Sequence, residues 1–229
     1  MFPAYARVLS DSPNKLTSEI DERHQPVVNY LREAALNAET EVILISPYFI
    51  PRDEGVQLIR ELVAKGVRVV ILTNSLASNN HVAAHSGYAR YRRDVVIAGA
   101  ELYEVRANAA YELSGNKDGP HTLTLHSKFL VIDRKQLFSG SLNLDPRSYD
   151  LNAEMGVFIN SEAIAGNITQ NMEQTLSTLT YRVRINDKGK LEWYSRIDKQ
   201  DVIETKEPLT GWWLRFKAWF MKIAPESQL

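Results

Sequence analysis

Cysteine is absent from the 229 residues, which excludes a disulfide framework and a thiolate metal site and suits a reducing compartment. An excess of either charge is also missing, because 27 Lys and Arg residues balance 28 Asp and Glu residues. Domains dedicated to duplex DNA usually carry a strong basic excess, so this balance argues against a nuclease without excluding one. The longest apolar run, 42–50, is far shorter than the roughly 20 residues that cross a bilayer. We therefore expect no membrane-spanning segment.

The chain is nevertheless 44% hydrophobic, which is enough for a large core. Apolar residues at helical spacing alternate with short apolar runs, and this alternation predicts an α/β fold with a mixed, largely parallel central sheet flanked by helices. The predicted helices cover 26–38, 54–65, 81–98 and 164–179, and the predicted strands cover 4–10, 42–46, 67–73, 101–105, 136–139 and 155–159.

The stretch 126–143 carries the chemistry-bearing residues. If His126 and Lys128 lie in a strand, their side chains project from the same face because strand residues alternate. Asp133 has the opposite parity and follows the apolar run 129–132, so we expect it to brace a turn. Asn143 follows a Gly-Ser bend and is predicted to fold back beside His126.

These residue types suit phosphate esters. Imidazole attacks phosphorus or passes a proton near neutral pH, while an ammonium and a carboxamide hold anionic phosphoryl oxygens. The chemistry needs no metal or other cofactor. Glu154 precedes the strand 155–159, where its carboxylate is expected to take a proton from His126; the alternative is an ordinary carboxylate at a sheet edge. A lone His-x-Lys pair can also be merely solvated.

The pattern HxK-x4-D-x6-G(G/S)xN, formed here by His126, Lys128, Asp133, Gly140-Ser141 and Asn143, resembles the signature of the phospholipase D superfamily. Flanking segments 47–51, 98–104, 143–148 and 151–154 are similar to the C-terminal half of bacterial cardiolipin synthases, over about residues 1–185. The resemblance implies a phospholipase D-like α-β-α sandwich and substrate contacts from four residues (Tyr48, Ser141, Arg147 and Ser148).

By this resemblance, a phosphatidyl group passes from a donor phospholipid through a phosphohistidine to the hydroxyl of phosphatidylglycerol. Two alternatives are hydrolysis, as in a phospholipase D, and a non-catalytic half that binds phospholipid headgroups. Superfamily enzymes use two facing motifs, whereas this chain has one. We expect the second motif to come from a missing N-terminal half, which would make His126 the general acid, or from a homodimer, in which His126 takes both roles.

One long segment, 81–98, carries two further candidate sites. His81 and His85, a helical turn apart, would begin a zinc site if a third ligand existed; a polar helix face is the alternative. Tyr88 and the basic-aromatic run 90–93 form either a phosphate patch or a solvated face. His121 is expected in a loop.

We expect residues 1–185 to form the catalytic half-domain and residues 186–229 to form an extension, with a hairpin around 186–189 and an amphipathic helix within 209–223. Aromatic residues gather on one face of that helix and suit the headgroup boundary of a bilayer (Trp212, Trp213, Phe216, Trp219 and Phe220). Docking on the protein's own core is the alternative. The expected location is peripheral, on the cytoplasmic side of the cell membrane, with phospholipid substrates and no nucleic-acid partner.

Overall fold

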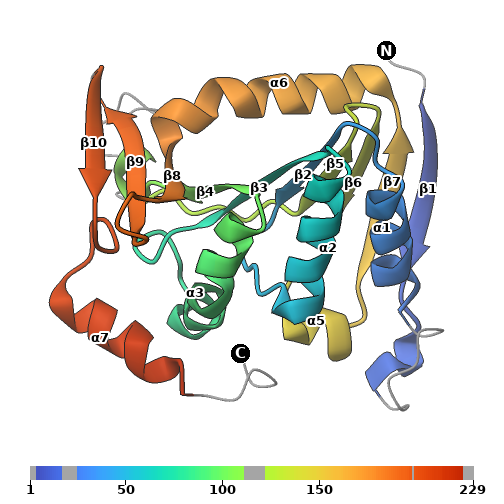
Figure 1. Cartoon of the computed structure of the whole chain (residues 1–229). Coiled ribbons are helices and arrows are strands. Elements are labelled where there is room, and N and C mark those ends of the chain that lie inside the picture. The colour runs from blue at the N-terminus through green and yellow to red at the C-terminus, as the bar shows by residue number, and fades with distance from the viewer. Residues whose placement is uncertain (1–3, 17–24, 111–121, 198, 224–229) are drawn as a thin grey trace.

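A single open sheet organises the fold (Figure 1). The computed structural model describes residues 4–16, 25–110, 122–197 and 199–223. Within these residues the sheet has ten strands in the order β1-β7-β6-β5-β2-β3-β4-β8-β9-β10. The strands are β1 (Tyr5–Ser10), β2 (Glu41–Ile45), β3 (Arg68–Asn74), β4 (Glu101–Val105), β5 (Phe129–Ile132), β6 (Gln136–Gly140), β7 (Met155–Asn160), β8 (Thr180–Ile185), β9 (Leu191–Ile197) and β10 (Gln200–Glu204).

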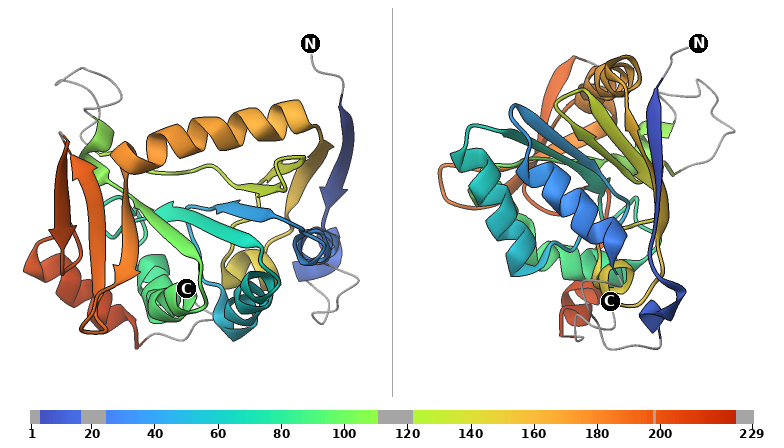
Figure 2. Two further views of the ribbon diagram at one scale, coloured as in Figure 1. Left: turned by 45° about the horizontal axis from the view of Figure 1, so that its top comes forward. Right: turned by 90° about the vertical axis from the view of Figure 1, so that its right-hand side faces the viewer.

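Helices cover both faces of this sheet (Figures 1 and 2). The long helix α6 (Glu162–Leu179) lies on one face, and α1 (Pro26–Leu36), α2 (Arg52–Ala64) and α3 (Val82–Ile97) lie on the other, with the short α5 (Pro146–Asp150) beside them. Two short 3-10 helices, η1 (Pro13–Leu16) and η3 (Ala107–Ala109), and the terminal α7 (Trp212–Met221) complete the described elements. The predicted α/β sandwich is confirmed.

Fewer neighbouring strands are parallel than the sequence predicts. Among the described strands, β2 pairs with β3 and β3 with β4 in parallel, and the other neighbours are antiparallel. The reason lies in the connections, since parallel neighbours need a crossover such as α2 or α3. The three-residue turn between β5 and β6 is compatible only with an antiparallel pair.

The core has two layers because strand residues alternate between faces. On β2, Val42 joins the cluster beneath α1 and α2, whereas Ile43 and Ile45 join the cluster beneath α6. Its partner β5 divides in the same way, with Leu130 on the first side and Val131 on the second. The central strands are therefore apolar on both faces, which explains why the sequence shows them as continuous apolar runs.

The C-terminal strands continue the same sheet across position 185. β8 pairs with β4, and the turn at 186–189 joins β8 to β9, which pairs with β10. The helix α7 then packs against α3. In the part of the chain that the structure describes, no helix combines the length and apolar character needed to cross a membrane.

Candidate active site

His126 and Lys128 precede β5 instead of lying within it. The prediction that both residues lie in a strand is therefore wrong. The ladder begins at Phe129, which pairs with Ile45, and residues 122–128 run outside any named strand. Alternation along a strand therefore does not set their directions. The Lys128 ammonium turns back and donates a hydrogen bond to the His126 carbonyl oxygen at 2.8 Å. His126 is exposed and Lys128 is half-buried.

Asn74, at the end of β3, holds the segment that carries His126. Its Oδ1 accepts a hydrogen bond from the Leu125 backbone N–H at 2.8 Å, and its Nδ2 donates to the Leu125 carbonyl at 3.1 Å. The side chain thus pairs with Leu125 as a neighbouring strand would. Asn74 is buried. It positions the backbone immediately before His126.

Two carboxylates lie in the electrostatic neighbourhood of Lys128. Partial burial lowers the pKa of the Lys128 ammonium, and the charges of Glu154 and Asp145 oppose this shift. Burial also raises the pKa of Asp145, and the Glu154 charge adds to that rise. The charges of Glu154 and Asp145 therefore act on Lys128 from the β7 entry and from the α5 cap.

Glu154 is buried and held by several bonds. The Ser141 hydroxyl donates to its carboxylate, and the Ser141 backbone N–H donates to the Met155 carbonyl at 2.8 Å. These contacts join the Gly-Ser bend of the motif to the start of β7. Ser141, expected to contact substrate, thus binds the carboxylate of Glu154. A proton exchange between Glu154 and His126 stays a prediction.

A buried ion pair that the sequence did not indicate holds the backbone at Glu154. The Lys15 ammonium lies 2.7 Å from the Asp11 carboxylate, and both side chains are almost fully buried. Asp11 also accepts a hydrogen bond from the Glu154 backbone N–H at 3.2 Å, while Lys15 donates to the Ser148 carbonyl at 2.9 Å. Asp11 and Lys15 therefore tie the start of the chain to the site.

The arm 143–148 wraps around the cap of α5. The Asn143 backbone N–H donates to Ser148 Oγ at 3.3 Å, and the Ser148 N–H donates to Asp145 Oδ1 at 2.8 Å, which makes Asp145 the N-cap. Asn143 Oδ1 is buried, and no hydrogen-bond partner for it occurs among the described residues. Ser148 is buried as part of this cap, whereas Arg147 is exposed on α5.

Tyr48 lies within the electrostatic influence of Asp145. Its hydroxyl donates to Asn80 Oδ1 at 2.8 Å, and its ring meets the edge of the His81 ring at a centroid distance of 5.4 Å. Burial raises the pKa of the Tyr48 phenol, with a further contribution from the Asp145 charge. The phenol is therefore a neutral hydrogen-bonding group near Asp145 at physiological pH.

Asp133 lies at the opposite end of β5 from His126 and Lys128. Its carboxylate accepts backbone hydrogen bonds from residues 39–41 and one from the Thr40 hydroxyl, at 2.8–3.2 Å. Although partial burial opposes ionisation, these donors hold the pKa of Asp133 below its usual value. Its contacts hold the β5–β6 turn against the start of β2.

On α3, the side chains of His85, Tyr88 and Arg92 are buried instead of facing a ligand. His81 caps the start of this helix and is exposed. Arg92 lies 2.9 Å from the Glu104 carboxylate and donates to Glu207 at 2.7 Å and to His85 Nε2 at 2.9 Å. Tyr88 donates to the same Glu104 at 2.8 Å. Tyr88 and Arg92 therefore form neither a phosphate patch nor a solvated face. Within the described ranges, no cluster of three His, Asp or Glu side chains could hold a metal ion. His121 lies outside the described residues.

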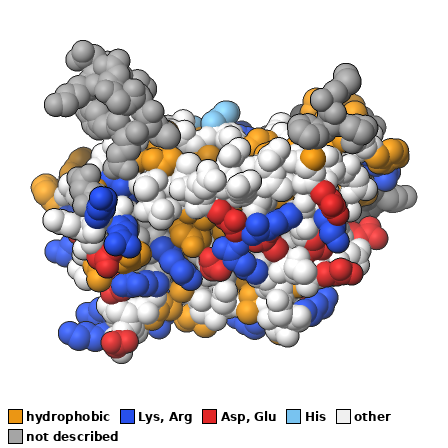
Figure 3. All heavy atoms as spheres, turned by 90° about the horizontal axis from the view of Figure 1, so that it is seen from above, with side chains coloured by type: hydrophobic (Ala, Val, Ile, Leu, Met, Phe, Trp, Pro, Cys, Tyr) orange, Lys and Arg blue, Asp and Glu red, His pale blue; other side chains and the backbone are white. Residues whose placement is uncertain are grey.

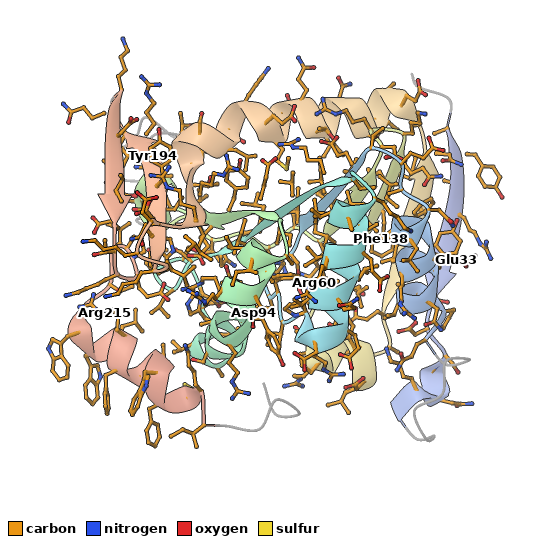
Figure 4. All side chains as sticks on the ribbon, in the orientation of Figure 1. Glu33, Arg60, Asp94, Phe138, Tyr194 and Arg215 are labelled. Carbon is orange, nitrogen blue, oxygen red and sulfur yellow. The ribbon has the colours of Figure 1, made fainter. Side chains whose placement is uncertain are left out.

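The aromatic residues of α7 point away from the fold (Figure 4). Trp212 is 70% exposed and Trp219 62%, and the rings stack along the helix from Trp213 through Phe216 to Phe220. The opposite side of the helix supplies the buried Ala218. The helix α7 docks on α3 and leaves its aromatic residues exposed, so contact of this face with a membrane stays a prediction.

The fold and this arrangement of residues define a phospholipase D-like domain. Residues 31–176 match the family described as cardiolipin synthase, PLD-like domain, and the chain belongs to that family. It is 35% identical to cardiolipin synthase C of Escherichia coli over 99% of its length, and 29% identical to an uncharacterized protein of Helicobacter pylori over its whole length. The alignments cover 48% and 45% of those proteins, so the chain spans about half the length of these relatives.

Solved structures show the same fold at low sequence identity. A phospholipase D family member, Nuc from Salmonella typhimurium, superposes with a TM-score of 0.54 at 16% identity, covering 75% of this chain and 93% of Nuc. Phosphatidylserine synthase from Haemophilus influenzae gives a TM-score of 0.51 at 16% identity, covering 77% of this chain and 39% of that protein. At such identities, the likeness concerns the fold alone.

Proposed function

We propose that this chain supplies one half of a phosphatidyltransferase site. In the first step, a histidine nitrogen forms a bond to phosphorus as the bond from phosphorus to the donor's leaving oxygen breaks, and a facing imidazolium protonates that oxygen. In the second step, the hydroxyl of phosphatidylglycerol attacks phosphorus and passes its proton to that facing imidazole, releasing the first histidine. His126 takes one of these roles. Where it is the nucleophile, Glu154 accepts the proton from its other ring nitrogen as the bond to phosphorus forms and returns it when the histidine is released.

The observation that carries this proposal is the pair His126 and Lys128, which lies directly before β5 in a chain of the cardiolipin synthase family, with the half-buried Lys128 ammonium within the electrostatic influence of Glu154 and Asp145. Lys128 supplies positive charge for the phosphoryl oxygens. The Asn143 carboxamide supplies a second polar contact, because its Nδ2 can donate to a phosphoryl oxygen. Arg147 is exposed on the same arm and extends the cationic surface toward a headgroup.

The second motif comes from a partner, either an N-terminal half or another copy of this chain. The exposed position of His126 is consistent with a site that a second half completes. The same exposure favours hydrolysis as a second candidate function, because water competes with a lipid hydroxyl for the phosphohistidine. A nuclease is disfavoured by the balanced charge, and Figure 3 shows acidic and basic side chains interspersed on the face that carries α6.

Thin-layer analysis of labelled phosphatidylglycerol incubated with the protein tests the chemistry. Cardiolipin as the product supports transfer, and phosphatidic acid supports hydrolysis. Either product must disappear in His126→Ala and Lys128→Ala and persist in Lys188→Ala, whose side chain is exposed in the β8–β9 turn. No product from a preparation that contains two motifs would leave headgroup binding as the function.

We also propose that α7 rests in the headgroup layer on the cytoplasmic side of the membrane. Its aromatic face is exposed, and Arg215 and Lys222 supply cations for anionic lipids. Anionic vesicles should shift the tryptophan emission to shorter wavelength. Trp193 is buried, so the shift should vanish when Trp212, Trp213 and Trp219 are changed to serine. Equal emission with and without vesicles would contradict membrane contact.

A further inference from the structure

A large apolar cavity lies between α1, α2 and the sheet and reaches the candidate site. Its volume is about 320 Å³, in the range of sites that hold small ligands. Helix α1 contributes Val28 and Leu31, α2 contributes Leu58 and Leu62, and the sheet contributes Leu44 and Leu130. Phe138, labelled in Figure 4, lines it from β6.

Most residues that line the cavity are apolar, and the polar or charged ones are Gln25, Arg32, Ser46, Arg52, Glu54, Lys128 and Asp150. Lys128 and Ser46 border it at the carboxyl end of β2, and Leu142 and Leu144 of the motif arm border it nearby. Val42 and Val69 border the other end, where β2 pairs with β3. From Ser46 to Val42 the strand rises by about 13 Å. A ligand that fits has an anionic group at Lys128 and an unbranched apolar chain about that long.

A phospholipid has this combination of groups, because each acyl chain begins a few bonds from the phosphodiester. Apolar cavities of about 150 Å³ already stay dry and bind apolar molecules. Each methylene that leaves water for such an environment strengthens binding about fourfold. A free phosphate ester would gain nothing from the apolar length of the cavity.

We propose that this cavity accepts one acyl chain of the lipid whose phosphate binds at Lys128. The proposal rests on the proposed function, since it takes the phosphate of the substrate to lie at the motif. The cavity between α1, α2 and the sheet therefore determines which acyl-chain lengths the protein accepts. It also separates two lipid contacts, because α7 contacts the membrane while the cavity receives the chain of the reacting molecule.

Binding of phosphatidylglycerols with progressively longer chains, kept below micelle-forming concentrations, tests the proposal. The dissociation constant should fall about fourfold per methylene until the cavity is filled and then level off. In Leu58→Trp, which places a larger ring in the cavity, levelling should occur at a shorter chain. Ile97→Trp, on the exposed side of α3, should match the unmodified protein. Identical chain-length curves for all three folded proteins would overturn the proposal.

A second measurement uses the unmodified protein and remains informative if Leu58→Trp fails to fold. Phosphatidylglycerol with a photoreactive group at the chain end should cross-link to α1, α2 and β2, whereas labelling confined to α7 would overturn the proposal. Lys128→Ala separates the two hypotheses. Chain-length dependence that is unaffected by Lys128→Ala would retain the cavity and contradict the phosphate site. Binding that depends on Lys128 but not on chain length would retain the phosphate site and contradict the cavity as the chain site.

Discussion

The buried pair Asp11–Lys15 gives a sharp test of how the site is supported. Replacing Lys15 by Met keeps an unbranched side chain that lacks only the terminal ammonium, and it leaves the Asp11 carboxylate buried without its cation and the Ser148 carbonyl without its donor. Breaking a buried pair from one side typically costs about 3–5 kcal/mol. Because the backbone N–H groups of Val27 and Glu154 still donate to Asp11, we expect the lower end, about 3 kcal/mol.

Urea unfolding monitored by circular dichroism measures this loss. In a chain of this size, about 3 kcal/mol corresponds to a fall in Tm of roughly 6–12 °C. Lys188→Met, at an exposed position, should stay within about 0.5 kcal/mol of the unmodified protein. The double variant Asp11→Asn with Lys15→Met should lose less than the sum of the two single losses. A loss below about 1 kcal/mol in Lys15→Met would refute the role assigned to the pair.

Three further predictions concern other parts of the fold. Gly140→Ala places a Cβ 2.5 Å from the Met155 carbonyl oxygen and should cost about 1–3 kcal/mol in urea unfolding, whereas Gly166→Ala, with open space on α6, should gain about 1 kcal/mol; equal effects would contradict the clash. Glu207→Gln should lower Tm. Burial opposes ionisation of Glu207, but Arg92 holds its pKa well below the ordinary 4.5, so the charge stabilises the fold fully above that pH. The Tm difference should therefore shrink as pH falls below about 4.5, and a constant difference would refute this reasoning. Asp133→Ala should lower Tm more than Asp133→Asn, with turnover following the folded fraction; unchanged Tm in both would contradict the bracing contacts.

The fold class and the main elements could be predicted because they depend on local patterns. The strand expected at 101–105 has the observed bounds of β4, since a short apolar run follows the Gly99 helix stop. The antiparallel half of the sheet was harder to predict from the sequence, because the direction of each strand depends on which strands become neighbours in the folded chain. The segment 122–128 illustrates this: its apolar alternation resembles a strand, but it lies outside any named strand, and the Asn74 side chain binds its backbone at Leu125.

The candidate site was predictable where residue type alone carries the chemistry, as for His126 and Lys128. The contacts that hold the site in place could not be predicted, because they join residues far apart in the sequence. Asn74 contacts Leu125 across 51 positions, and Arg92 contacts Glu207 across 115. Charged residues such as Asp11 and Arg92 also suggest a surface location until a partner is found. Only the folded chain brings those partners together.

The requirement for two motifs is the central claim, and it is tested most directly by measuring turnover and mass together. Labelled phosphatidylglycerol would be incubated with this chain at concentrations where light scattering defines the fraction of monomer and dimer. We expect no turnover from the monomer, and we expect activity that rises with the dimer fraction or with an added second half and disappears in His126→Ala. Robust turnover by a demonstrated monomer would contradict it.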